Sequence, residues 1–223
     1  MSGAAVEPGA DSSSAEGNVV GGSQHWQEVY SGRSTRDVSW FQPEPDVSLR
    51  LVLANTSVES PLVDVGSGTS YLGDRLLARG YVDVTLVDIA PSSLDEVSTR
   101  IGDVGSRLTC VVSDVLDWSP TRAYDLWHDR AVFHFLVDDV RRDRYVALVA
   151  RTLRPGGVLV MGAFAEDGPS HCSGLPVRRY SVEELVATFA RSFSFDNGEH
   201  EVHVTPGGAQ QPFNWVVFRR TQS

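Results

Sequence analysis

The sequence predicts an α/β fold with a doubly wound, mostly parallel sheet. Short Val/Leu-rich runs, each long enough for a buried strand, alternate with helical patterns from residue 61 to residue 191. Such an alternation favours parallel strands that are joined through helices on both faces of the sheet. With 223 residues, of which 41% are hydrophobic, the chain is long enough for one domain of this kind with its own core.

The N-terminal part predicts a tail followed by two helices. Residues 1–23 are rich in Gly, Ser and Ala and carry three acids but no basic residue, so we expect a disordered tail and a folded domain over residues 24–223. The tail does not resemble a signal peptide, and no run of eighteen apolar residues occurs, so we expect a cytoplasmic protein with no membrane partner. Apolar positions at helical spacing around Trp26 and Tyr30, and again from Val47 to Leu53, predict helices.

The remaining elements follow in order. Strands are predicted in PLVDVG, VDVTLVDI, RLTCVVSDV, the start of YDLWHDRAVFHFL, and GVLVMGAF. Helices are predicted in SYLGDRLLARG, SLDEVSTRI, VRRDRYVALVARTL and SVEELVATFAR. Gly80 closes the first helix, Ser92 or Ser93 caps the second, and Ser181 with Glu184 forms a capping box for the last. The final β runs, joined through Pro-Gly-Gly, predict an antiparallel pair at the edge of the sheet.

Charge and cysteine content restrict the partners. The net charge is −10, and no basic stripe is visible, which argues against nucleic acid as a partner. Arg141, Arg142 and Arg144 alternate with aspartates, which predicts a solvated helix face. Two cysteines, Cys110 and Cys172, form neither a disulfide framework nor a metal cluster. We therefore expect a reducing compartment and no metal.

A glycine turn follows the first predicted strand. In a doubly wound sheet the first strand-to-helix turn passes close to the ligand, and Gly66 and Gly68 permit that approach. A dinucleotide fingerprint would also require glycine at position 71, where the chain has Tyr71. No Tyr-x-x-x-Lys motif occurs either. The turn therefore favours a nucleoside ligand other than a nicotinamide dinucleotide.

A carboxylate lies at the end of each of the first three strands. Asp88 is at the end of the second strand, where an acid accepts hydrogen bonds from ribose hydroxyls. Asp64 precedes the glycines, where its charge would repel a pyrophosphate but suits a positively charged amino group. Asp114 follows the third strand, within reach of an adenine amine. Three acids at three successive strand ends predict one site at that edge of the sheet.

Five segments in order resemble the motifs of class I S-adenosylmethionine-dependent methyltransferases. They are LVDVGSGTS, VTLVDIA, VSDVLDW, YDLWHDRAVFHFL and LRPGGVLVMGAF, and the resemblance extends over about residues 25 to 220. It implies a Rossmann-like, seven-stranded sheet whose last strand is antiparallel, and S-adenosylmethionine as cofactor. The family often has a third glycine at position 70, where this chain has Ser70. The resemblance and the strand ends together predict a cofactor site of Trp26, Tyr30, Trp40, Asp64, Gly66, Ser67, Gly68, Asp88, Ile89, Ser113, Asp114, Val115 and His128.

The N-terminal segment and the HDR triplet narrow the resemblance. HWQEVYSG, VSWFQPEP and HDR are similar to a small-methyltransferase branch that includes lysine methyltransferases acting on elongation factor and on citrate synthase. In that branch the N-terminal segment folds over the cofactor as a helical lid. The resemblance thus brings Trp26, Tyr30, Trp40 and Phe41 near the sulfonium, where aromatic faces favour a cation. The alternative is that these rings only pack the lid onto the sheet.

Candidates for the transfer step lie after the fourth and fifth strands. His128 is the first choice for a base or a positioning group, because histidine accepts a proton near neutral pH. Arg130 and His134 lie on the same segment, although His134 has apolar neighbours typical of a core. His171 and Cys172 lie in a long loop after strand five, where an acceptor pocket is expected.

No motif in the sequence identifies the molecule that accepts the methyl group. We favour methyl transfer to an O, N or S atom of a small molecule. A protein lysine is the alternative acceptor, and a non-catalytic domain that binds S-adenosylmethionine and supports a partner protein is the alternative of another class. We expect a monomer or a weak dimer.

Overall fold

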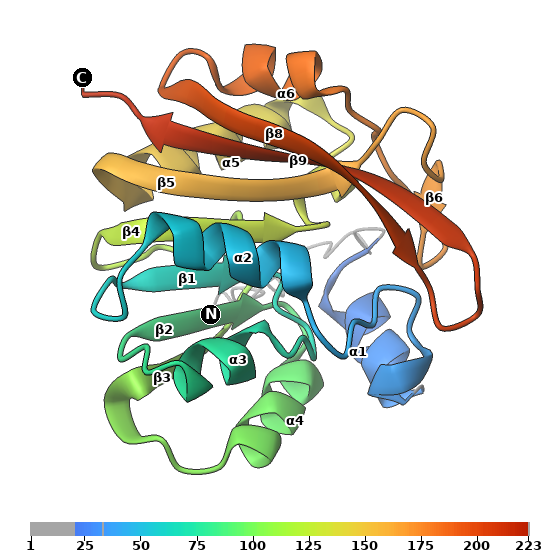
Figure 1. Ribbon diagram of the computed structural model, residues 1–223. Helices are drawn as coiled ribbons and strands as arrows, with labels where there is room; N and C mark the ends of the chain where they lie inside the picture. The colour runs from blue at the N-terminus through green and yellow to red at the C-terminus, as the bar shows by residue number, and fades with distance from the viewer. Residues whose placement is uncertain (1–20, 33, 223) are drawn as a thin grey trace, which may run out of the picture.

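A seven-stranded sheet forms the centre of the protein (Figure 1). The computed structural model describes residues 21–32 and 34–222. The strand order is β3-β2-β1-β4-β5-β9-β8, and β6 and β7 form a separate small sheet. The strands are β1 (Leu62–Val65), β2 (Val84–Asp88), β3 (Leu108–Val112), β4 (Tyr124–Arg130), β5 (Leu153–Phe164), β6 (His171–Cys172), β7 (Leu175–Pro176), β8 (Phe193–Val204) and β9 (Gln210–Arg220).

The predicted fold class is confirmed, including the antiparallel last strand. Strands β1 to β5 pair in parallel, and β9 is antiparallel to both β5 and β8. The predicted antiparallel pair β8 and β9 lies at the edge of the sheet. Its last strand, β9, pairs with β5, where Val158 is opposite Arg219 and Phe164 is opposite Phe213, and β8 forms the outer edge.

Helices cover both faces of the sheet (Figure 1). The α-helices are α1 (Ser23–Ser31), α2 (Asp46–Asn55), α3 (Leu72–Ala78), α4 (Pro91–Ile101), α5 (Asp139–Thr152) and α6 (Val182–Phe189). Short 3-10 helices are η1 (Thr35–Asp37), η2 (Gly105–Arg107) and η3 (Phe133–Phe135). Within the described residues, no helix combines the length and the apolar character needed to cross a bilayer.

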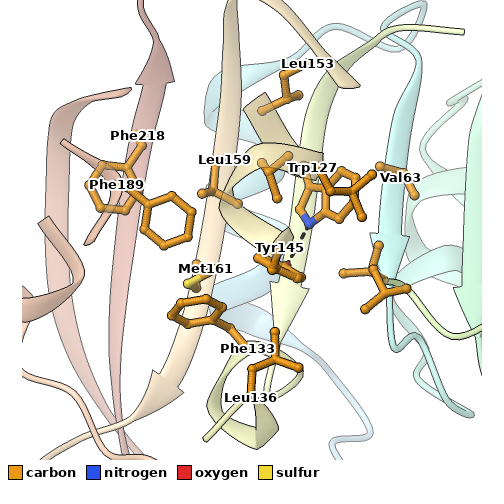
Figure 2. Packing of buried hydrophobic residues seen from close by; sticks show 14 of the residues in the cluster. Val63, Trp127, Phe133, Leu136, Tyr145, Leu153, Leu159, Met161, Phe189 and Phe218 are labelled. Atoms are coloured by element: carbon orange, nitrogen blue, oxygen red, sulfur yellow. Dashed lines mark hydrogen bonds between the residues drawn. The ribbon is translucent and has the colours of Figure 1, made fainter. Parts of the chain in front are cut away.

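The core divides into one cluster on each face, because successive strand residues point to opposite sides. Leu126 of β4 packs with α2, α3 and α4, whereas its neighbour Trp127 packs with α5 and α6. Figure 2 shows the second face, where the Trp127 indole N–H donates to the Tyr145 hydroxyl at 2.9 Å among buried aliphatic and aromatic side chains. The same alternation sends His128 and Asp129, the next two residues of β4, to opposite faces.

Two helix starts show how local sequence sets the element boundaries. The capping box of α6 is present, with the Ser181 hydroxyl accepting from the Glu184 N–H and the Glu184 carboxylate accepting from the Ser181 N–H. The predicted cap of α4 at Ser92 or Ser93 is wrong, because the helix begins at Pro91. Proline suits the first helical position, where its missing N–H has no intrahelical partner to lose.

Helix α1 lies beside the carboxyl ends of the strands, in blue in Figure 1. The Ser23 hydroxyl donates to the Ile89 carbonyl at 3.0 Å, and the Ser92 N–H donates to the Gln27 side chain at 3.3 Å. The first helix is therefore fixed to the segment that follows β2, in the position expected for a lid. Ser23 is its first residue, and residues 1–20 of the predicted tail lie outside the described residues.

Candidate functional site

A cavity of about 250 Å³ opens at the carboxyl ends of the central strands. We call it the main cavity. Its walls come from the ends of β1, β2, β4 and β5, the start of β9, the segment after β3, and α1. A smaller cavity of about 40 Å³ lies beside it, between Trp40, the glycine turn and β4, and Gly66 and Arg130 line both.

The glycine turn adopts a backbone that other residues rarely allow. Gly66 has φ +59° and Gly68 has φ +51°, both in the left-handed region. A Cβ atom on Gly66 would overlap the Cγ2 atom of Val132, and one on Gly68 would overlap the Tyr30 hydroxyl. Both positions therefore require glycine for two reasons: the left-handed backbone of the turn, and the close approach of the Val132 and Tyr30 side chains.

Tyr71 fills the position where a dinucleotide fingerprint would have glycine, and Arg100 of α4 holds it. The Arg100 guanidinium carbon lies 4.1 Å from the centre of the Tyr71 ring. The same guanidinium donates to the carbonyls of Thr69 and Ser70 at 3.2 and 2.8 Å and pairs with Asp74 at 2.8 Å. The end of the turn is thus fixed by an arginine, in a place where a dinucleotide's third glycine would allow close helix packing.

Asp88 connects the glycine turn to the end of β2. Its carboxylate accepts from the Gly68 N–H and from the Ala90 N–H, both at 2.8 Å. Burial raises the pKa of Asp88 above its ordinary value, against the opposing effect of these hydrogen bonds. Each carboxylate oxygen retains a further lone pair, and Asp88 lines the main cavity. The group is therefore fixed in place and still able to accept hydrogen bonds from a ligand.

The segment after β3 forms the next wall of the main cavity. Ser113, Asp114 and Val115 line it together with Ile89. The Asp114 carboxylate accepts from the Leu116 N–H at 2.9 Å and lies 3.7 Å from the Arg141 guanidinium. The arrangement puts an ordered acid at this end of the cavity.

The arginine cluster on α5 is only partly the solvated face that its alternating charges suggested, because Arg144 and the three aspartates are exposed but the other two arginines are not. Arg141 lines the main cavity beside Asp114, and Arg142 is buried, donating to the carbonyls of Leu136 and Val137 at 3.0 and 2.7 Å. These carbonyls follow η3 and need donors that the sequence pattern alone does not reveal.

Aromatic rings from the N-terminal segment close one side of the main cavity. Trp26, Tyr30 and Trp40 line it and pack on one another, with ring centroids 6.0 to 6.4 Å apart. Trp26 also contacts Phe135 of η3 edge to face at 5.2 Å. The rings therefore do more than pack the lid, because they also form part of the cavity wall, and their position near a sulfonium stays a prediction. Phe41 lies instead against Tyr71, at 6.1 Å, and lines the smaller cavity.

Asp64 and His128 form a buried pair on adjacent strands. They are directly opposite in the β1–β4 register, and the His128 Nδ1 atom lies 2.6 Å from the Asp64 carboxylate. Both line the smaller cavity, together with Ser67, and neither lines the main one. The His128 Nε2 atom is buried without a hydrogen-bond partner in the described part of the chain. The pairing fixes the ring and the carboxylate beneath the glycine turn.

Arg130, the last residue of β4, lies between the two cavities. One terminal nitrogen, Nη1, donates to the Trp40 carbonyl at 3.2 Å, and the guanidinium carbon lies 4.8 Å from the centre of the Phe213 ring. Burial lowers the pKa of Arg130 from its ordinary value. The next residue, Ala131, has φ +73°, an uncommon conformation for a residue other than glycine, at the point where the chain leaves the strand.

Three further predicted residues have different outcomes. His134 is fully buried between Phe135 and Phe164 and lines neither cavity, so its proposed catalytic role is corrected to a core role. Burial lowers its pKa to about 3, which keeps the ring neutral.

His171 is exposed and outside both cavities, whereas Cys172 is buried and lines the main one, because adjacent residues of β6 point to opposite sides. Burial raises the pKa of the Cys172 thiol to about 11, so it remains protonated.

The last strands supply a wall of the main cavity that the sequence patterns do not predict. Phe164 ends β5, and Gln211 and Phe213 begin β9, and all three line the main cavity. Val132 and Phe135, after β4, complete this side. Within the described residues, no group of three or more His, Cys, Asp or Glu side chains is arranged to hold a metal ion.

Asp129 supports the site from the opposite face of β4. Its carboxylate accepts from the Val132 N–H at 2.9 Å, the Phe133 N–H at 3.2 Å and the Tyr145 hydroxyl. Burial raises the pKa of Asp129 to about 6, against these hydrogen bonds, which lower it. Asp129 therefore orders the turn that carries Val132, while its own ionisation is costly.

This carboxylate predicts a pH-dependent stability. Because the folded pKa of about 6 exceeds the unfolded value of about 3.9, the stabilisation is present below about pH 4 and is lost as pH rises through 6. We expect the unfolding free energy of the wild type, relative to Asp129→Asn, to fall by on the order of 3 kcal/mol across that range. Urea unfolding of both proteins from about pH 3 to about pH 7.5, a span that brackets both pKa values, measures this change. A difference that does not change with pH would contradict the assignment.

Comparison with known proteins finds one family whose model matches part of the chain. The family described as "Methyltransferase domain" matches residues 62–157. Malonyl-[acyl-carrier protein] O-methyltransferase 1 of Ilyobacter polytropus is 27% identical over 94 residues, which cover 42% of this chain and 35% of that protein. This chain therefore matches well under two thirds of that relative's length.

Solved structures give the same fold over most of the chain. A structure from work on the conversion of a disulfide bond into a thioacetal group during echinomycin biosynthesis has a TM-score of 0.72 at 22% identity and covers 89% of this chain and 93% of that one. The Burkholderia thailandensis 1,6-didemethyltoxoflavin-N1-methyltransferase, with its bound substrate and S-adenosylhomocysteine, has a TM-score of 0.65 at 20% identity, covering 91% and 85%. At these identities the likeness establishes the fold.

Proposed function

The chain belongs to the class I S-adenosylmethionine-dependent methyltransferases, and from that premise we propose that it methylates a small molecule. The observation that carries the proposal is the main cavity, which combines the glycine turn, Asp88 and Asp114 at successive strand ends with an aromatic wall. Ligands of doubly wound sheets bind at this edge. The cavity therefore suits a nucleoside cofactor with a second ligand beside it.

The residues present fit S-adenosylmethionine, whose sulfonium supplies an electrophilic methyl group. We assign Asp88 to the ribose hydroxyls, because its carboxylate is fixed and lines the main cavity. Ser113, Asp114 and Val115 are assigned to the adenine ring. The glycine turn and Asp64 are assigned to the methionine part. Gly68 donates its N–H to Asp88, so a single hydrogen bond links the ribose and methionine sides.

The chain's contribution to the transfer is to align the two ligands and to exclude water. Trp26, Tyr30 and Trp40 form an apolar wall that would keep water away and present aromatic faces to a cation. An acceptor held in line with the methyl group would take it, and the electron pair of the carbon–sulfur bond would stay on sulfur. A protonated acceptor then loses its proton to solvent or to a neighbouring group.

We propose a positioning role for His128 rather than that of a base. Its ring is hydrogen-bonded to Asp64 and borders the smaller cavity, away from the wall formed by Phe164 and Phe213. We expect His128→Ala to weaken S-adenosylhomocysteine binding and turnover together by about tenfold, because Asp64 loses a charge-assisted hydrogen bond. Calorimetry and initial rates measure the two effects. A loss of turnover with unchanged affinity, and rescue of turnover by added imidazole, would instead identify His128 as the base.

A small acceptor is favoured over a protein lysine. The aromatic lid and the β6–β7 segment border the cavity from two sides, which limits access for a protein chain. Of the similar proteins named above, the Burkholderia enzyme acts on the small molecule 1,6-didemethyltoxoflavin. Two free cysteines, of which Cys110 is exposed, further favour a reducing, cytoplasmic location. We retain a monomer or weak dimer as the expected assembly.

The proposal is tested by binding and by transfer. We expect S-adenosylhomocysteine, and not NAD, to raise the melting temperature, because only ligands of the folded state stabilise it. Tritiated S-adenosylmethionine incubated with the protein and a cell extract should then label the small-molecule fraction. Stabilisation by NAD alone would contradict the cofactor assignment. Label confined to protein would support the lysine alternative, and cofactor binding with no transfer to either fraction would support a non-catalytic binding domain.

A further inference from the structure

Arg130, which borders both cavities, has an unused pair of hydrogen-bond donors. Its Nη1 atom is occupied by the Trp40 carbonyl, but its Nε and Nη2 atoms are buried and have no hydrogen-bond partner in the described part of the chain. Nε–H and Nη2–H point along the same side of a guanidinium. This side is the fork that binds a carboxylate through two parallel hydrogen bonds.

The other charges at the main cavity already have partners. Arg141 lies 3.7 Å from the Asp114 carboxylate, and Asp88 accepts two backbone N–H groups. Two acids near Arg130 are also engaged: Asp64 is paired with His128, and Glu201 accepts from Gln42 and from the Trp215 indole. Among the residues that the structure describes, Arg130 is thus the cavity arginine that lacks a carboxylate partner, and an unpaired buried charge is costly.

The position of the fork favours the acceptor over the cofactor. The guanidinium packs on Phe213 of β9, and Phe164, Gln211 and Cys172 line the cavity on this side. Phe164 on β5 and Gln211 and Phe213 on β9 lie beyond β4 in the strand order, whereas the proposed ribose and adenine sites follow β2 and β3 on the other side of β1. A ligand beside Phe213 would therefore occupy the part of the cavity that the nucleoside does not. The carboxylate of the methionine part is the rival occupant of the fork, because Arg130 also lines the smaller cavity with Gly66 and Asp64.

We propose that Arg130 binds a carboxylate of the methyl acceptor, which is therefore a small organic acid. The inference rests on the proposed function and names its substrate class. A single unpaired cation among the described cavity residues matches a carboxylate better than a phosphate monoester, which carries up to two charges. The apolar rings of Phe164 and Phe213 would cover the carbon skeleton of the acid. Arg130 would thereby select the acceptor and orient it toward the methyl group.

The test compares acids with their amides on the protein saturated with S-adenosylhomocysteine. The probes are 4-hydroxybenzoate and indole-3-acetate with the corresponding primary amides, and binding is measured by ligand-observed NMR. We expect the acids to bind at least about tenfold more tightly than the amides, since a bidentate charged contact is lost in the amide. Arg130→Gln should abolish this preference, and Arg130→Lys should retain only part of it. The control Arg178→Gln, at an arginine outside both cavities, should keep the preference.

A second measurement excludes the cofactor as the source of the carboxylate. S-adenosylhomocysteine carries one in its amino-acid part, and 5′-methylthioadenosine does not. If Arg130 serves the acceptor, Arg130→Gln changes the affinity for the two ligands by the same factor. A selective loss for S-adenosylhomocysteine of about tenfold or more would overturn the proposal. Equal binding of acids and amides to the wild type would also overturn it, whereas failure of the wild type to bind S-adenosylhomocysteine would contradict the proposed function instead. Circular dichroism of each variant checks that it is folded.

Discussion

Replacement of Gly66 by alanine is expected to damage both the stability of the fold and the binding of the cofactor. Gly66 has φ +59°, and its Cβ atom would overlap the Cγ2 atom of Val132. Left-handed strain and overpacking together would destabilise the protein by roughly 2–6 kcal/mol. Because Gly66 lines both cavities, the methyl group also displaces a ligand from the turn. Urea unfolding and calorimetry with S-adenosylhomocysteine measure the two losses separately.

Gly80→Ala is the matched control for this prediction. Gly80 also has a positive φ, +91°, but nothing lies within 4 Å of the position of its Cβ atom. It therefore reports the conformational cost without the overlap. A double variant, Gly66→Ala with Val132→Ala, should recover part of the stability, because it removes the overlapping methyl group, and a double-mutant cycle isolates that term. If Gly66→Ala were no more destabilising than Gly80→Ala, the overlap with Val132 would not contribute to the loss of stability.

The strands and the acids at their ends were readable from the sequence for a simple reason. Each buried parallel strand is a continuous apolar run, so its end is marked by the first polar residue. Asp88 ends the buried run of β2, and Asp114 follows the apolar run of the edge strand β3, which is only partly buried; both acids line the main cavity. Residues that depend only on being at a strand end are therefore accessible to sequence reasoning.

Residues that depend on which strands are neighbours were not readable in the same way. The Asp64–His128 pair arises from the β1–β4 register, and those strands are separated by two others in the sequence. Phe213 reaches the cavity only because β9 inserts between β5 and β8. His171 and Cys172 differ by one position, and the two-residue period of a strand sends just one of them inward. Sheet order and side-chain direction are long-range properties that local patterns do not encode.

Asp88 is expected to be the main determinant of cofactor affinity. Under the proposed function, its ionised carboxylate accepts hydrogen bonds from the ribose hydroxyls while it holds the N–H groups of Gly68 and Ala90. Asp88→Asn removes the charge and leaves one of those N–H groups without an acceptor. A charged hydrogen bond contributes about 1.5–3 kcal/mol, so S-adenosylhomocysteine should bind roughly 10- to 150-fold more weakly. Asp95→Asn, at an exposed position on α4, is the control and should bind normally.

The ligand itself separates a contact with the ribose from a general effect on the glycine turn. If Asp88 binds the hydroxyls, the wild type discriminates against the 2′-deoxy analogue of S-adenosylhomocysteine and Asp88→Asn does not. If Asp88 only orders the turn, both proteins discriminate equally. Since burial raises the pKa of Asp88, wild-type affinity should also fall as pH is lowered through that pKa, whereas the affinity of Asp88→Asn should not. Unchanged affinity in Asp88→Asn would remove this residue from the site, and the assignment of the ribose to the end of β2 with it.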